Sequence, residues 1–225
     1  LQNLDFDTWS LMGNTGFSYD VVFHFFKKMV NYQGKSSELR GKEGPLKVSE
    51  VSDRNPIYDA LFKSGEVNGI PFNEDYNGED QEGIGYTQTT IYKGERMSAE
   101  VAYLKPIKSR DNLTISTNSL VTKLLFEGKT CIGVELKNKN KLTKFHALKA
   151  VILCGGAINS PQILELSGIG NPSILKEKNI DPIHKLMGVG ENLRDHIAPR
   201  IVYKVDKPGI AYNDKARGLN LVKQV

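Results

Sequence analysis

The chain has 225 residues, of which 39% are hydrophobic, and a formal net charge of +4. This length allows one or two domains with a sizeable core, and no run approaches the roughly 18 apolar residues of a membrane span. The lysine cluster at 137–144 could contact nucleic acid or anionic lipid, but a solvated hairpin tip is the simpler interpretation. We therefore predict neither a nucleic-acid partner nor a membrane span.

Two amphipathic helices are predicted in the first third of the chain. The first is capped by Ser18 and runs to about Val30, with lysines at its carboxyl end, where they complement the helix dipole. The second opens at Asn55-Pro56, because proline suits the first helical position, and stops near 69–71. Its predicted buried residues are Ile57, Ala60 and Leu61.

Extended chain follows these helices. Asp75-Tyr-Asn-Gly78 has the composition of a turn, and residues 84–92 are predicted to be stretched. A further short helix is expected to be capped by Ser98 and ended by Pro106.

From Leu113 onward the pattern is that of an antiparallel meander. Predicted strands cover residues 113–117, 119–126, 131–136 and 143–148, with turns at 127–129 and 137–142. The meander leads into residues 151–154, whose continuous apolar run indicates a strand covered on both faces.

A small-residue turn and a helix complete this unit. Gly155, Gly156 and Ala157 remove side-chain bulk, so backbone can approach a ligand or another element closely. Ser160 and Pro161 are predicted as N-cap and first helical residue, and Gly168 as the helix stop. The strict Gly-x-Gly-x-x-Gly fingerprint is not found here, so geometry alone leaves cofactor contact and plain packing equally open. Another amphipathic stretch covers residues 172–178.

Cys131 and Cys154 lie in apolar strand contexts without the paired spacing of a metal site. We therefore expect two buried free thiols and no metal. Asn112-Leu-Thr114 is a glycosylation sequon that would suit a secreted protein. Sequons also arise by chance, so the compartment stays open.

Spaced motifs cover nearly the whole chain. Residues 156–170 carry Gly156-Ala-x-x-Ser160-Pro161-x-Ile163-Leu164-x-x-Ser167-Gly168-Ile169-Gly170. Further motifs are Gly13-Asn14-x-Gly16-Phe17-Ser18-Tyr19-Asp20, Gly94-x-Arg96-x-Ser98, Arg110-x-Asn112-Leu113 and Gly188-Val-Gly190-x-Asn192-Leu193-x-Asp195-His196. In this order they resemble the glucose–methanol–choline (GMC) oxidoreductases, FAD-dependent alcohol oxidases and dehydrogenases, and residues 156–170 resemble that family's second signature. The departures are mild: Phe17 replaces the usual tryptophan, Met187 proline and Gly155 alanine.

The resemblance implies an α/β fold: a parallel-sheet FAD-binding domain with an antiparallel meander, plus segments of a substrate-binding domain. The implied division is an extended FAD-binding region at 1–44, a substrate-domain segment at 45–75, the FAD-binding core at 76–195 and the start of another substrate-domain segment at 196–225.

The resemblance also implies function. It suggests a glucose dehydrogenase-like enzyme that oxidises the CH–OH group of a small-molecule alcohol or sugar by hydride transfer to FAD. The matching cofactor residues are Val121, whose backbone would hold the adenine ring, and Gly155, Gly156 and Ala157, which would form a turn beside the adenosine end of FAD. For Val121, contact with the cofactor and the role of an ordinary strand residue are about equally open. For the turn, two glycines in a row at a strand end favour close approach of the cofactor to the backbone.

No catalytic residue is expected in this chain. The opening βαβ unit and the catalytic histidine pair of the family have no match, which predicts an internal fragment that is inactive alone. Asp195-His196 invites a catalytic interpretation, but adjacent residues on extended chain point opposite ways, so we interpret the pair as structural. The alternative is a non-catalytic truncated remnant that serves at most as a binding or structural module. The choice between oxidase and dehydrogenase, and the oligomeric state, stay open.

Overall fold

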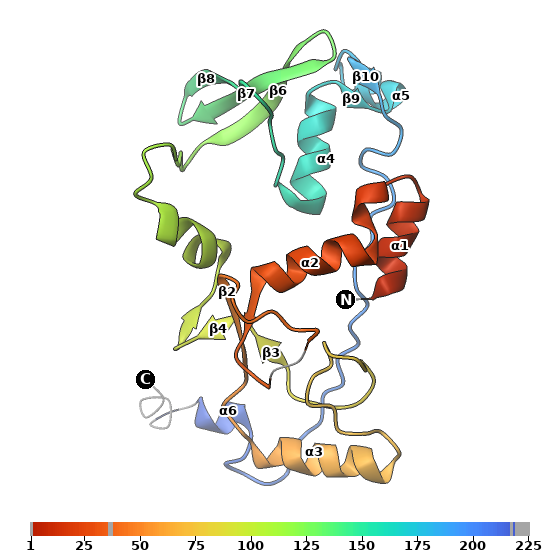
Figure 1. Ribbon diagram of the computed structural model, residues 1–225, viewed down its shortest axis with the longest axis vertical. Helices are drawn as coiled ribbons and strands as arrows, with labels where there is room; N and C mark the ends of the chain where they lie inside the picture. Colours follow the sequence, from red (N-terminus) through yellow and green to blue (C-terminus); the bar gives the residue numbers. More distant parts are fainter. Residues whose placement is uncertain (1, 36–37, 217, 219–225) are drawn as a thin grey trace. The chain divides into compact units, whose positions relative to one another are not determined.

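The computed structural model describes residues 2–35, 38–216 and 218. The chain divides into two compact units, one formed by residues 1–113 with 202–225 and the other by residues 114–201 (Figure 1). The mixture of helices and sheets confirms the predicted α/β class. Among the described residues, no helix combines the length and the apolar character needed to cross a bilayer.

The helices of the first unit surround two small sheets. Their bounds are α1 Asn3–Leu11, η1 Thr15–Phe17, α2 Tyr19–Met29, α3 Pro56–Val67, η2 Glu100–Leu104, η3 Lys105–Ile107 and α6 Tyr212–Lys215. The predicted first helix is α2, but the Ser18 side chain does not cap it. Instead the Tyr19 N–H donates a hydrogen bond to Asp7 Oδ1 at 2.9 Å, so a side chain of α1 accepts from a free N–H group in the first turn of α2.

The predicted second helix is α3, and its cap is confirmed. Asn55 Oδ1 accepts a hydrogen bond from the Ile57 N–H at 3.0 Å. The predicted buried face is wrong for Ala60 and Leu61, which are exposed. The reason is aromatic packing: Phe62 points inward, with its ring centroid 5.1 Å from that of Phe72 and 4.8 Å from that of Tyr86.

The sheets of the first unit are short. Their strands are β1 Val30–Tyr32, β2 Leu46–Glu50, β3 Gln88–Thr89, β4 Ile91–Tyr92 and β5 Glu95–Arg96. Strand β2 pairs parallel with β1 and antiparallel with β3, and β4 pairs with β5. Gly41 and Gly44 allow the loop before β2 to lie directly against the backbone at the end of α2, because a Cβ at either position would collide with it.

The short helix after Ser98 forms with a different geometry. Ser98 Oγ accepts a hydrogen bond from the Val101 N–H at 3.2 Å, as a cap does. The helix then continues as a π-turn and a 3-10 turn, η2 and η3. Pro106 was expected to end the helix, but it lies inside η3. Proline is tolerated there because the backbone N–H that it lacks would have no hydrogen-bond partner in the first turn of a helix.

The second unit contains the predicted meander. Its strands are β6 Leu120–Glu127, β7 Thr130–Asn138 and β8 Lys141–His146, antiparallel in the order β6-β7-β8. Residues 113–117 form no strand, contrary to prediction. Helix α4 (Gly156–Leu166) packs on β6, and the pair β9 (Ile169–Gly170) and β10 (His184–Lys185) is parallel, with α5 (Pro172–Glu177) between them in the chain (Figure 1).

Three further expectations for this unit are wrong. Residues 151–154 form no ladder among the described residues, and Ile152 is 83% exposed; Cys154 is exposed and Cys131 only half-buried. An apolar run becomes a buried strand only where neighbouring strands flank it. Helix α4 also begins at Gly156, four residues before the predicted cap Ser160, whose hydroxyl accepts the Gly155 N–H at 3.0 Å. Gly168, at φ +82°, ends the helix as predicted.

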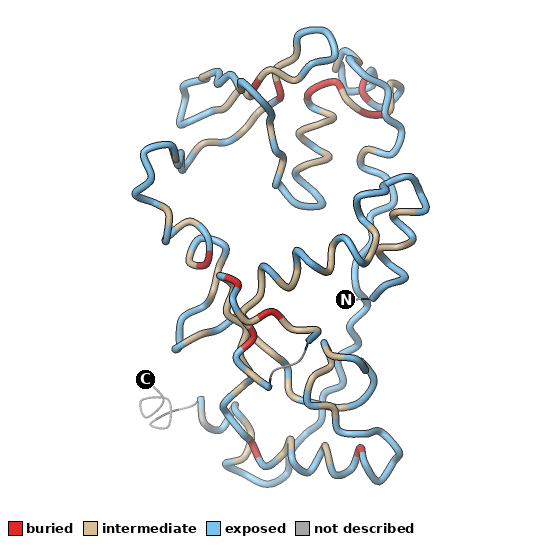
Figure 2. The backbone as a smooth tube through the Cα atoms, viewed as in Figure 1, coloured by how far each residue is buried: buried red, intermediate tan, exposed pale blue. Residues whose placement is uncertain are grey.

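Buried residues are few and lie in small groups (Figure 2). Tyr32 and Ala102 are the apolar core of the first unit, and Leu124 and Leu175 that of the second.

Candidate functional site

The predicted cofactor turn lies exposed at the start of α4. Gly156 has φ +79°, a conformation that favours glycine, and a Cβ built there meets no atom within 4 Å. Gly155 and Ala157 are exposed beside it. Main-chain N–H groups at the start of a helix attract polar and anionic groups. The turn thus offers accessible backbone at a helix N-terminus.

Apolar side chains flank this turn. Ile152 is 83% exposed and Ile158 74% exposed. Open small-residue backbone bordered by apolar side chains suits an aromatic ring system with polar edges, because the ring covers the apolar surface while its edges form hydrogen bonds. The residues present therefore fit the adenosine end of FAD.

Val121 lies half-buried in β6, opposite Leu136 of β7. The register of the two strands shifts between Val121 and Lys123, which locally interrupts the ladder. Val121 and the glycine turn belong to the same compact unit, as the predicted site requires.

Ser167 joins the helix of this site to its sheet, a role that the sequence analysis missed. Its hydroxyl accepts a hydrogen bond from the Leu124 N–H at 2.8 Å and donates to the Ile163 carbonyl. Ser167 is 6% exposed, so it fixes the end of α4 to the middle of β6. A small polar residue next to a helix-ending glycine was the only available signal.

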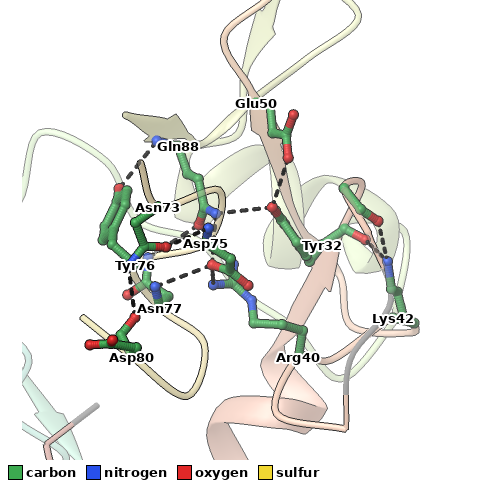
Figure 3. Close-up of polar contacts among 11 residues, drawn as sticks. Tyr32, Arg40, Lys42, Glu50, Asn73, Asp75, Tyr76, Asn77, Asp80 and Gln88 are labelled. Atoms are coloured by element: carbon green, nitrogen blue, oxygen red, sulfur yellow. Dashed lines mark hydrogen bonds and ion pairs between the residues drawn. The ribbon is translucent and has the colours of Figure 1, made fainter. Parts of the chain in front are cut away.

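The first unit holds a polar cluster around the buried Tyr32 that the sequence did not reveal (Figure 3). We call Tyr32, Arg40, Glu50, Asp75 and Gln88 the Arg40 network. The Arg40 guanidinium forms an ion pair with Asp75 Oδ1 at 2.9 Å and donates to Gln88 Oε1 at 3.0 Å. Its Cζ lies 4.0 Å from the centroid of the Tyr32 ring.

Gln88 and Tyr32 extend this network to a second carboxylate. Gln88 Nε2 donates to Asp75 Oδ1 at 2.8 Å and to the Tyr32 hydroxyl at 3.0 Å, which in turn donates to Glu50 Oε1 at 3.0 Å. Burial and the bond to Glu50 raise the pKa of Tyr32, so this hydroxyl stays protonated and remains a donor. The Arg40 network therefore ties the 73–80 loop to the β1–β2–β3 sheet.

The remaining candidates carry no chemistry of their own. Asp195 Oδ1 accepts the backbone N–H of His196 at 2.8 Å, so this carboxylate is engaged with main chain. In the described part of the chain, no group of three or more His, Cys, Asp and Glu side chains could hold a metal ion. Asn112 of the sequon lies exposed in a turn.

Comparisons with known proteins agree with the motifs. The family model described as GMC oxidoreductase matches residues 2–198. The chain is 41% identical over 204 residues to the mitochondrial choline dehydrogenase of Homo sapiens, covering 91% of this chain and 34% of that protein. It is 40% identical over 210 residues to the oxygen-dependent choline dehydrogenase of Brucella suis, covering 93% of this chain and 38% of that protein.

Solved structures show the same relationship. An FAD-dependent oxidoreductase from Chaetomium thermophilum is similar at 30% identity and a TM-score of 0.79, over 85% of this chain and 36% of that one. Aspergillus oryzae formate oxidase is similar at 28% identity and a TM-score of 0.78, over 87% and 35% respectively. The chain thus spans about a third of the length of the relatives it matches. It belongs to the GMC oxidoreductases, a family of FAD-dependent enzymes, as its motifs predicted.

Proposed function

We propose that this chain supplies part of the FAD-binding site of an oxidoreductase that acts on the CH–OH group of a small alcohol. The exposed glycine turn at the start of α4, in a chain of this family, carries the proposal. Gly155, Gly156 and Ala157 lie beside the adenosine end of the cofactor, and Val121 holds the adenine ring through its backbone. When bound, FAD supplies the acceptor for the hydride of the alcohol carbon.

The chain's own contribution is to bind and orient the cofactor. Ser167 keeps α4 on β6, and Ile152 and Ile158 offer apolar surface for a bound ring to cover. No residue of this chain is assigned to proton transfer. Similarity to choline dehydrogenases favours a small amino-alcohol substrate over the sugar that a glucose dehydrogenase would take.

The proposed division of the chain follows the family. Residues 1–44 and 76–195 belong to the FAD-binding domain, and 45–75 and 196–225 to the substrate-binding domain. Support comes from the placement of Val121 and the glycine turn in one compact unit, residues 114–201, most of which lies within 76–195.

A matched pair of glycine variants tests the cofactor site. Gly156 and Gly128, the latter in the β6–β7 turn, both have positive φ and open space where a Cβ would lie. Alanine costs each about 1–2 kcal/mol of backbone strain. We expect Gly156→Ala to weaken FAD binding about tenfold, about 1.4 kcal/mol, because its methyl group intrudes on the cofactor. Gly128→Ala should leave FAD affinity within about twofold.

FAD binding is measured by flavin fluorescence together with the thermal shift of the protein, since a ligand of the native state must raise its melting temperature. Equal affinities of the two variants would contradict the assigned turn. A cooperatively folded protein without saturable FAD binding would instead support the alternative of a non-catalytic module.

A further inference from the structure

A cleft within the first unit, lined by none of the proposed cofactor residues, has the features of a small-molecule site. It encloses about 390 Å³ beside α2, the loop that contains Arg40 and the β2–β3 strands. Small-molecule sites usually measure about 300–1,000 Å³ and are mostly apolar with a few polar groups. The apolar lining consists of Phe23, Phe26, Val30, Leu39 and Val48.

The charged residues that line this cleft are both cations. They are Lys27 and Arg40, and no carboxylate is among its described lining residues. Arg40 is already paired with Asp75. Within the described part of the chain, Lys27 Nζ has no carboxylate within ion-pair distance and lies 5.5 Å from the centroid of the Phe23 ring. The cleft thus holds a half-buried, unpaired ammonium group against aromatic surface.

The mouth of the cleft is also basic. A neighbouring hollow of about 830 Å³ shares Phe23, Lys27, Arg40 and Gly41 with it, so the two are continuous. Lys28 and Lys42 add positive charge at this mouth, against the carboxylates of Asp20 and Glu43. Leaving out Arg40, which is paired with Asp75, three lysines face two carboxylates, so the entrance keeps a net positive charge that raises the local concentration of anions.

We propose that this cleft binds a small organic carboxylate with an aromatic or branched apolar body. The carboxylate pairs with Lys27, and the apolar body packs against Phe23, Phe26 and Val48. One unpaired cation in a largely apolar cavity matches a single negative charge on an apolar molecule. Inorganic phosphate has no apolar body, so it would leave the aromatic wall uncovered. None of the residues proposed to hold FAD, Val121 and 155–157, is among those that line this cleft.

Calorimetric titration of the protein with 4-phenylbutyrate tests the proposal, with the neutral 4-phenylbutanamide as the matched probe. Saturable carboxylate binding is expected, with the amide at least about tenfold weaker, since it lacks the charge that Lys27 pairs. Lys27→Gln should weaken carboxylate binding by about tenfold. Lys63→Gln, at an exposed position of α3, is the control and should leave it unchanged.

A second variant tests the cavity itself. Val48→Phe places a ring in the cleft and should abolish binding while circular dichroism shows the fold retained. If this variant does not fold, Lys27→Gln still decides the question. The proposal is overturned by no saturable binding, by equal binding of amide and carboxylate, or by equal effects of the Lys27 and Lys63 variants. None of these results bears on FAD affinity, so the two proposals fail separately.

Discussion

The Arg40 network and the glycine turn of α4 are opposite kinds of polar construction. In the network the Arg40 side chain is 8% exposed and its guanidinium is matched by Asp75 and Gln88 of the same chain. At the turn Gly156 faces open space and Ile152 beside it is 83% exposed. Buried polar groups that are fully partnered hold a structure together, whereas exposed backbone with apolar neighbours is available to a ligand. The difference indicates that the first region stabilises the fold, whereas the second is accessible to the cofactor that we propose it binds.

Removing the central cation of the Arg40 network should have the largest effect. Arg40→Met leaves Asp75 and Gln88 without their partner in a region that water reaches poorly. Breaking a buried pair costs about 3–5 kcal/mol, and because Asp75 is 24% exposed we expect about 2–3 kcal/mol less free energy of unfolding in urea. Lys105→Met is the control, since its pair with Glu95 is exposed, lies outside the network at 3.6 Å and should contribute about 1 kcal/mol or less. Equal losses in both variants would show that the network does not hold the unit together.

No sequence pattern could have predicted this network. Tyr32, Arg40, Glu50, Asp75 and Gln88 come from five separate segments without a common period. Of these five residues, the sequence analysis singled out only Asp75, as part of a predicted turn. Sequence patterns such as helix caps and strand alternation report on residues that are close together in the chain. The members of this network meet only through tertiary contacts, which such patterns do not describe.

At the second region, the link between helix and sheet should matter more than the turn itself. Ser167→Ala leaves the buried Leu124 N–H without an acceptor, which we expect to lower the free energy of unfolding by about 1–3 kcal/mol. Ser160→Ala removes the acceptor of the exposed Gly155 N–H, which water can replace, so its effect should be below about 1 kcal/mol. Amide hydrogen exchange at Leu124 gives an independent measure, and unchanged protection in Ser167→Ala would contradict the assigned role.

Most elements whose signals are local were predicted well, although the side chains of Ser18 and Ser160 do not cap α2 and α4 as expected. The cap and proline of α3, the alternating strands β6 to β8 and the Gly168 stop depend on nearby residues and are confirmed. Expectations that required a distant partner were wrong, as for the inward face of α3 and the burial of residues 151–154. The Val121 and Gly155–Ala157 assignments depend on a cofactor and stay predictions. The structure places them in one unit, and their affinity for FAD depends on the contacts that their backbone makes with the cofactor.

The smallest expected effect concerns the segment that follows the second unit and returns to the first. Asn55 Nδ2 donates to the Ile210 carbonyl at 3.0 Å, and the Tyr212 hydroxyl donates to the Asp53 carboxylate. The bond to Asp53 raises the pKa of Tyr212 to about 12. The folded pKa exceeds the unfolded value of about 10, so the stabilisation is complete below about pH 10 and is lost as pH rises toward about 12.

Ultraviolet titration of tyrosinate absorbance measures this effect. Tyr212→Phe should remove one of the late-titrating tyrosines, whereas Asp53→Asn should keep that tyrosine and shift its titration back toward about pH 10. Tyr32 also titrates late, for a different reason: burial comes first among the causes, so Asp53→Asn should not affect it. If Asp53→Asn left the titration of both high-pKa tyrosines unchanged, the segment around Tyr212 would not be held by Asp53. Its attachment to the first unit would then depend on the amide of Asn55, which also caps α3.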